Sequence, residues 1–128
     1  MGSLNKVQLI GNLGKEVSYR QLEGGAECST FPVATSEKYR DKDGQMQEIT
    51  DWHQVVVWGK KAVYCKDYLF KGSRVYIEGK LKNRSYQDKE GVKKYTTEVI
   101  VDKIIFLTSK ASDQQVSHDQ QEDDDLPF

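Results

Sequence analysis

The sequence QEITDWHQVVVW, residues 47–58, decides the fold class of this chain. Alternate residues of a β-strand point to opposite faces, so His53, Val55 and Val57 share one face of this stretch. The residues between them share the other face and include both tryptophans of the chain: Trp52, Gln54, Val56 and Trp58. The pattern predicts a strand with one face against a core and a second face that carries two indole rings.

Short runs rich in Val, Ile, Tyr and Thr lie on both sides of this stretch and indicate an antiparallel β domain. Strands are predicted near residues 4–13, 17–22, 28–37, 47–58, 74–86 and 93–107. Two hairpin loops end in glycines that can adopt a positive φ, at Asp41-Lys42-Asp43-Gly44 and at Asp88-Lys89-Glu90-Gly91. One helix is predicted before Gly72, where Ala62, Cys65 and Leu69 recur at helical spacing.

This order of elements predicts an all-β fold, an OB-fold that consists of a five-stranded Greek-key barrel with one short helix. A β-sandwich is the structural alternative. Residues 1–108 are predicted to form the single folded domain. Apolar periodicity then stops, so residues 109–121 are predicted to be a disordered linker and residues 122–128 a separate acidic tip.

The formal net charge of −1 averages two unlike segments. Residues 111–128 contain six acidic residues and no Lys or Arg, so the rest of the chain is basic. A basic body suggests a polyanionic partner, and an acidic tail suggests a separate task. No apolar run is long enough to cross a membrane and no signal peptide is recognisable, so we expect a protein that stays in the compartment where it is made.

The run at residues 74–86 predicts a second functional face. Its apolar side consists of Val75, Ile77, Gly79 and Leu81, with Gly79 a possible bulge position. The opposite side is basic and aromatic, with Arg74, Tyr76, Glu78, Lys80, Lys82, Arg84 and Tyr86. Rings interleaved with cations are what binding of single-stranded nucleic acid requires, because each base has a face to stack and each nucleotide a phosphate. For Trp52 and Trp58 the alternative reading is an ordinary core position.

Nothing in the sequence indicates catalysis, a cofactor or a metal. Phosphate-binding loops, nucleophile elbows and zinc-protease motifs are absent. Cys28 and Cys65 lack metal-ligand spacing and are expected to be buried thiols. His53 is expected to be a hydrogen-bonded core or interface residue, and His118 falls in the predicted linker. We therefore predict a binding protein and not an enzyme.

The residues resemble the bacterial single-stranded DNA-binding protein family over residues 4–107 and the last seven. The matching segments are Asn5-Lys6-Val7, Leu9-Ile10-Gly11-Asn12-Leu13-Gly14, Ala34-Thr35-Ser36-Glu37, Trp52-His53, Val55-Val56, Gly59-Lys60, Tyr68-Leu69, Lys71-Gly72-Ser73, Val75-Tyr76-Ile77-Glu78-Gly79 and Tyr95-Thr96-Thr97-Glu98-Val99. The ending Asp123-Asp124-Asp125-Leu126-Pro127-Phe128 is similar to the acidic tip of that family.

The resemblance implies an OB-fold, usually a homotetramer, that binds and protects single-stranded DNA during replication, recombination and repair. Its stacking positions fall on Tyr39, Trp52, Trp58 and Tyr86, beside the basic residues Lys80, Lys82 and Arg84. Its subunit-interface histidine falls on His53. The acidic tip would recruit replication, repair and recombination enzymes, a form of C-terminal capture. A cytoplasmic, nucleoid-associated location follows from the same resemblance.

Three other readings remain open on the residues alone. An RNA-binding OB or cold-shock-like module is compatible with the strand pattern, because a protein distinguishes RNA from DNA largely at the 2′-OH. A pure assembly subunit would need no nucleic acid, and a small hydrolase would need catalytic residues that the sequence does not offer.

Overall fold

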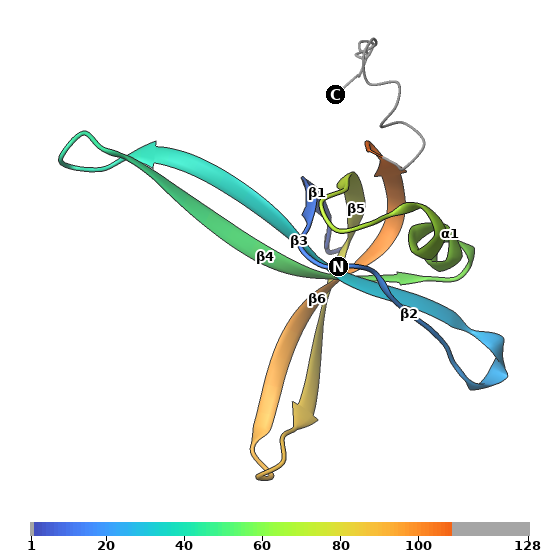
Figure 1. The fold of residues 1–128 in the computed structure, drawn as a ribbon. Coiled ribbons are helices and arrows are strands. Elements are labelled where there is room, and N and C mark those ends of the chain that lie inside the picture. The colour runs from blue at the N-terminus through green and yellow to red at the C-terminus, as the bar shows by residue number, and fades with distance from the viewer. Residues whose placement is uncertain (1, 109–128) are drawn as a thin grey trace.

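The computed structural model describes residues 2–108, which form six strands and one α-helix. The predicted linker (109–121) and acidic tip (122–128) lie outside the described residues. The strands are β1 (Val7–Leu13), β2 (Ser18–Gln21), β3 (Glu27–Arg40), β4 (Met46–Trp58), β5 (Arg74–Gln87) and β6 (Lys93–Phe106). Helix α1 (Lys60–Tyr68) follows β4, and a short 3-10 turn, Glu23–Gly25, precedes β3 (Figure 1).

Five strands close into a barrel, which confirms the predicted architecture. The strand order is β1-β5-β6-β4-β3, and β1 pairs back onto β3 through Asn12 and Leu13 to complete the ring. Strand β2 pairs with β3 outside this ring. The expectation of an antiparallel domain is wrong at one pair, because β4 and β6 run parallel over Gln54–Val56. A closed ring with an odd number of strands cannot alternate direction throughout, so one parallel pair is unavoidable.

The barrel core is formed by the inward faces that strand parity predicts. Val55 and Val57 of β4 are fully buried, as are Val75 and Ile77 of β5. Burial of each such side chain stabilises the folded state by about 1.5–3 kcal/mol. The other core residues include Leu13, Phe31, Val33, Ala62, Cys65, Leu69 and Val99. This packing leaves Trp52, Gln54 and Trp58 exposed on the opposite face of β4, where Val56 is only 6% exposed.

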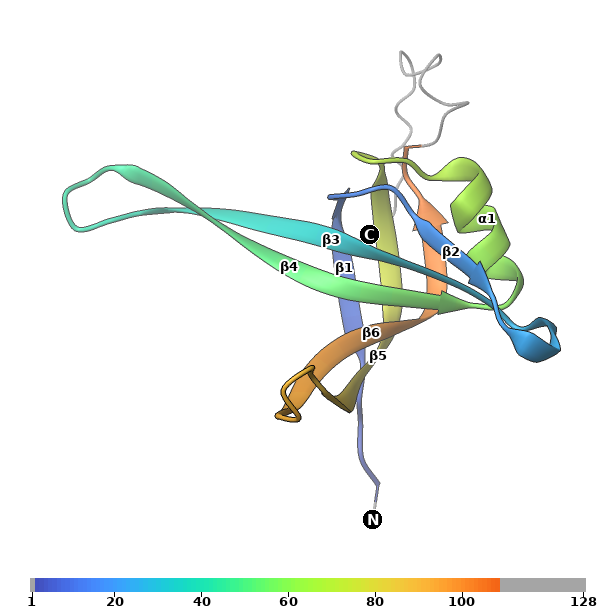
Figure 2. The same cartoon turned by 60° about the horizontal axis from the view of Figure 1, so that its bottom comes forward.

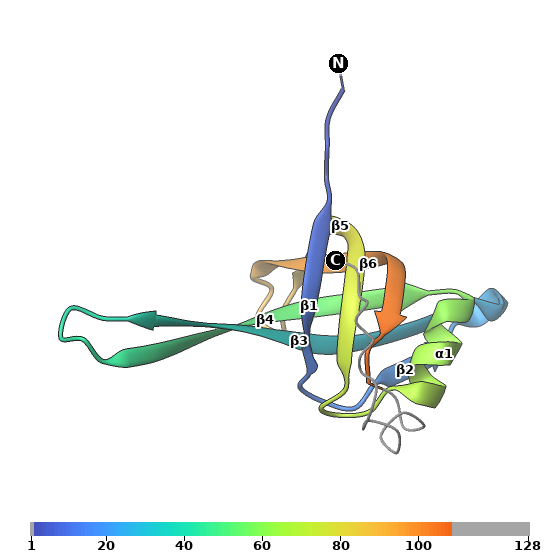
Figure 3. The ribbon, with the colours of Figure 1, turned by 90° about the horizontal axis from the view of Figure 1, so that it is seen from above.

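Helix α1 packs against β2, β3 and β4 with Ala62 and Cys65 on its buried side. The buried hydroxyl of Ser29 donates a 2.7 Å hydrogen bond to the carbonyl oxygen of Ala62 and ties the helix to β3. Figure 2 and Figure 3 show α1 at the end of the molecule opposite the tip of the β3–β4 hairpin. No helix within residues 2–108 is long and apolar enough to cross a membrane.

Strands β3 and β4, and likewise β5 and β6, continue beyond the barrel as hairpins that project in different directions (Figure 1). Gly44 and Gly91 adopt positive φ angles of 79° and 82° in the two loops, as the sequence predicts. Each loop is closed by an aspartate, Asp41 or Asp88, whose carboxylate accepts hydrogen bonds from two backbone N–H groups.

Strand β5 departs from its predicted pattern at one position. Leu81, expected on the buried side, is 46% exposed because β5 leaves the barrel there. The register shifts at Glu78 and Gly79, whose partners on β6 are Lys103 and Val101, so the extra residue of the bulge is Asp102. The side chains of β5 therefore continue to alternate between its two faces through the bulge.

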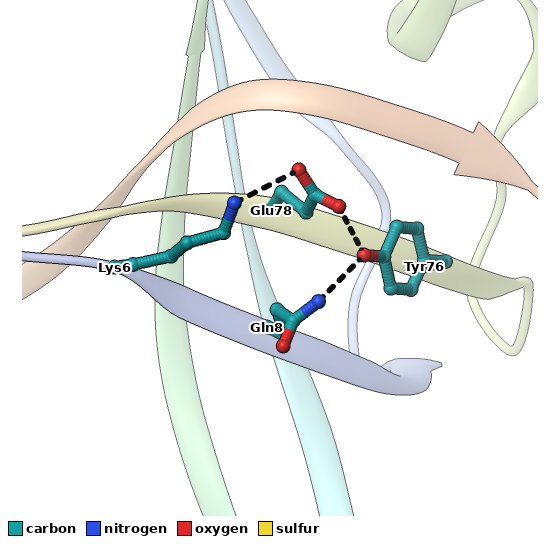
Figure 4. A network of polar contacts seen from close by, with 4 residues as sticks. All are labelled: Lys6, Gln8, Tyr76 and Glu78. Carbon is teal, nitrogen blue, oxygen red and sulfur yellow. Dashed lines mark hydrogen bonds and ion pairs between the residues drawn. The ribbon is translucent and has the colours of Figure 1, made fainter. Parts of the chain in front are cut away.

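A polar network joins the outer surfaces of β1 and β5 (Figure 4). The Gln8 amide donates a 3.1 Å hydrogen bond to the Tyr76 hydroxyl oxygen, and that hydroxyl donates to Glu78. The Lys6 ammonium lies 3.5 Å from the same carboxylate. These contacts lower the pKa of Glu78, the Tyr76 hydrogen bond being the largest cause and Lys6 and Lys103 adding to it.

Candidate nucleic-acid interface

The outer face of β4 presents both tryptophans to solvent. Trp52 is 60% exposed and Trp58 is 47% exposed, whereas Val55 and Val57 behind them are fully buried. The reading that places either indole in the core is therefore wrong. The two rings are six residues apart on one strand face, which corresponds to about 20 Å along the strand.

A cavity of about 560 Å³ lies beside Trp52. Its wall includes Gly14 and Lys15 from the segment after β1, Thr30 from β3, and Trp52 with Gln54 from β4. Gly14 lacks a side chain where the Trp52 ring lies, since a Cβ there would come within 2.2 Å of the ring. The indole and the backbone of the β1–β2 segment thus shape one end of the cavity.

A second cavity, of about 340 Å³, lies beside Trp58. Arg20 of β2 and the predicted residues Lys82 and Arg84 of β5 line it together with the indole. Thr30 also lines this cavity, so the two cavities adjoin on the outer face of the barrel. Cations from two strands therefore lie beside one exposed ring, and they include Lys82 and Arg84 of the predicted site.

The cations of this face differ in their ion pairing. Arg84 lies 2.8 Å from Glu98, whose side chain is only 11% exposed, and the hydrogen bond to that carboxylate raises the pKa of Arg84. Lys80 and Lys82 form no ion pair with another residue of the described range. Both ammonium groups are exposed and remain available to an anionic ligand.

The predicted tyrosines lie on the two hairpins. Tyr86 is 49% exposed and pairs with Lys94, on the β5 face that also carries Lys82 and Arg84. Tyr39 is 47% exposed and pairs with Gln47. The register places Tyr39 on the opposite face of the β3–β4 ribbon from Trp52, outside both cavities.

Comparison with known proteins matches residues 4–107 to the single-strand binding protein family. The chain belongs to this family. The resemblance stated from the sequence is thereby confirmed. A relative named single-stranded DNA-binding protein 1 from Chlorobaculum tepidum is 47% identical over 85% of this chain and 68% of its own length. A relative of the same name from Xylella fastidiosa is 43% identical over 92% of this chain and 88% of its own length.

Solved structures of the family share the fold. The Plasmodium falciparum SSB in complex with ssDNA superposes with a TM-score of 0.77 and 38% identity, over 84% of this chain and 98% of that one. A deletion mutant of the single-stranded DNA-binding protein from Thermus aquaticus gives a TM-score of 0.71 and 31% identity. This chain covers 84% of its own length and 52% of the Thermus chain in that match.

His53 lies on the inner side of β4 in this member of the family, half-buried, with its Nε2 atom 2.9 Å from the Thr35 hydroxyl. Cys28 and Cys65 are buried and unpaired thiols, and burial raises the pKa of Cys65 to about 12. Within residues 2–108 no three His, Cys, Asp or Glu side chains gather in a way that could hold a metal.

Sequence reasoning missed several residues that line the two cavities, Arg20 among them. Gly14, Gln54 and Glu98 all shape the two cavities. Gln54 could have been predicted, because strand parity places it on the same face as the tryptophans and between them. The contact of Gly14 with Trp52 joins segments distant in sequence, whereas that of Glu98 with Arg84 depends on the register of the consecutive strands β5 and β6.

Proposed function

We propose that this chain binds single-stranded DNA with little regard to sequence. The observation that carries the proposal is the pair of exposed indoles on one face of β4, each beside a cavity, with Arg20, Lys82 and Arg84 lining the cavity beside Trp58. Stacking of a base on an aromatic side chain contributes about 1–3 kcal/mol and is tolerant of sequence. The DNA-bound Plasmodium relative, which shares the fold, supports the same ligand class.

The residues divide into two roles. Trp52, Trp58, Tyr39 and Tyr86 stack on bases, and Lys80, Lys82 and Arg84 neutralise phosphates. Unpaired bases are required because the bases of a duplex are stacked on one another and their faces are not accessible to Trp or Tyr. The neutralised phosphates release counterions, so the affinity should fall as salt rises.

The test is titration of the full chain with dT oligomers of graded length, following the quenching of intrinsic Trp fluorescence. Strong quenching by single strands with little by the matching duplex is the expected result. An RNA oligomer of the same sequence should bind more weakly, and tighter binding to it would favour the RNA-binding reading. Unchanged fluorescence together with no binding of either oligomer by filter retention would refute the proposal and favour the assembly-subunit reading.

We further propose that the chain assembles with copies of itself, as a homotetramer. Residues 7–11 of β1 pair with β5 on one side, and within the described range no strand pairs with their other side. An open strand edge is a template for pairing with another chain. Ile10 on this edge is 38% exposed, and His53 on β4 is the second residue assigned to the interface. Sedimentation equilibrium should give four chains per particle, and a monomer would refute the assembly.

A role in replication, recombination and repair completes the proposal. It assigns recruitment of the enzymes of these processes to the tip Asp123-Asp124-Asp125-Leu126-Pro127-Phe128, with support from the sequence alone. The full chain should capture such enzymes from a bacterial extract, and a chain without residues 122–128 should not. A fluorescent fusion should lie in the cytoplasm over the nucleoid. Equal capture by both chains would refute the role of the tip.

A further inference from the structure

The cavity beside Trp52 is lined by polar side chains that form no hydrogen bond with any other residue in the range 2–108. The side chains of Gln54 and Thr30 line it, and neither forms a hydrogen bond with another side chain or backbone group of the described residues. Gln54 is exposed and Thr30 is half-buried. A side-chain amide carries two donors and an acceptor, and its partner here comes from outside the described residues or from water.

We propose that this cavity receives the edge of one unpaired base, and that the Gln54 amide hydrogen-bonds to that edge. The inference rests on the proposed function and adds a second mode of contact to it. Trp52 and Gln54 are neighbours on one strand face, about 7 Å apart along β4. A base that stacks on the indole therefore presents its edge within the same cavity, whose volume of about 560 Å³ is in the range of small-ligand pockets.

The charges around this cavity favour a base edge over a phosphate. Lys15 lines the cavity, but Glu16 lines it too, so the pair contributes no net charge. The cavity beside Trp58 is different, because three cations line it against the single carboxylate of Glu98. Phosphates are thus best accommodated beside Trp58, and a neutral hydrogen-bonding group beside Trp52.

An amide suits this task because it does not demand a particular base. The Watson–Crick edge of every base presents a donor next to an acceptor, and an amide can match either order by rotating through 180°. In a duplex those edges are already paired. Gln54 therefore selects against duplex DNA without selecting among the bases. Stacking on Trp52 also selects against duplex DNA, but only because the faces of paired bases are not accessible.

Replacement of Gln54 by glutamate gives a sharp test, because a carboxylate accepts hydrogen bonds and donates none. The thymine edge has a single donor between two acceptors, so one carboxylate oxygen is repelled. Cytosine and adenine have their amino donor at the end of the edge and avoid this conflict. Every base loses the hydrogen bond that the amide donated, but only thymine also meets a repelled oxygen. In Gln54→Glu the affinity for dT oligomers relative to dC and dA oligomers should therefore fall about 2- to 10-fold.

Two controls separate this effect from others. Gln21→Glu makes the same charge change on β2, outside both cavities, and should leave the dT to dC affinity ratio unchanged. Gln54→Leu should weaken binding of dT oligomers but not of an abasic oligomer of equal length. Thermal melting should be the same for all three variants, because position 54 is exposed.

The outcomes are distinct. An unchanged dT to dC ratio in Gln54→Glu, with binding of all oligomers reduced equally, would overturn the inference, because it would indicate a phosphate beside residue 54. Equal affinity of Gln54→Leu and the unmodified chain for dT would overturn it as well. If the unmodified chain itself fails to bind dT, the proposed function fails, and this inference with it.

Discussion

Gly14 lies directly against the indole ring of Trp52, so closely that a Cβ at position 14 would come within 2.2 Å of the ring atom Cζ3. The backbone of Gly14 does not adopt a positive φ. Alanine would therefore suit the backbone and conflict only with the ring. The indole can therefore occupy its place beside the cavity only because position 14 has no side chain.

Replacement of Gly14 by alanine should move the Trp52 ring and weaken binding of dT oligomers up to about 10-fold, within the range that loss of one stacking contact allows. The emission spectrum of the unliganded protein should shift as well. Gly2→Ala is the matched control, because no heavy atom lies within 4 Å of a Cβ at that position. Unchanged affinity and emission would show that the ring is not held by Gly14.

Trp58→Ala should weaken binding of single-stranded DNA by about 1–3 kcal/mol, because a stacking surface is lost. The melting temperature should hardly change, since the ring is 47% exposed and lies outside the core cluster. Tyr64→Ala removes a similarly exposed ring, 51% exposed on α1, away from both cavities beside the tryptophans. Equal losses of affinity in the two variants would contradict a specific role for Trp58.

Glu98→Gln should raise the affinity for dT oligomers, most clearly at low salt. The carboxylate occupies the cavity beside Trp58 and pairs with Arg84 at 2.8 Å, so it opposes phosphate binding there. Its removal leaves Arg84 free to neutralise a phosphate, and the log–log salt slope should steepen by about 0.7 per additional phosphate contact. Glu90→Gln in the β5–β6 loop is the control. A lower affinity in Glu98→Gln would mean that the ion pair positions Arg84 for DNA.

The Glu78 network should make stability depend on pH. Tyr76 and Lys6 lower the pKa of Glu78 in the folded state. The ionised carboxylate therefore stabilises the fold at any pH above its pKa in the unfolded chain, about 4.3. This stabilisation is lost as the pH falls through the lowered pKa of the folded state. The unmodified chain should melt higher than Glu78→Gln at pH 7, and the gap in melting temperature should be smaller at pH 3. A gap that is the same at both pH values would rule out an ionised Glu78 as the cause. Glu37→Gln, at an exposed position on the β3–β4 hairpin, is the control.

The parts that the sequence predicts correctly are those governed by local periodicity. Parity along β4 separates Val55 and Val57 from the tryptophans because a strand alternates its faces, whatever its neighbours are. Leu81 violates the same rule because burial also depends on where a strand leaves the barrel, which no local pattern records. The parallel pairing of β4 with β6 follows from ring closure, a property of the whole sheet.

The contacts of the candidate site were beyond sequence reasoning for a related reason. Arg84 and Glu98 are brought together by the β5–β6 register, and Gly14 meets Trp52 across two strands. The first relationship depends on the register of two consecutive strands, and the second on tertiary packing. The residue types were therefore predictable, and their partners were not.

Thr30 forms part of the wall of both cavities. The two indoles lie about 20 Å apart along β4, so a strand that occupies both cavities crosses the shared wall. The sugar-phosphate link across this wall has less freedom once the nucleotide at one end is bound. The ordering of that link then assists the second nucleotide, as in any coupled binding. Affinity should accordingly rise in a step at the oligomer length that reaches across the shared wall, and more gradually for each nucleotide added beyond it.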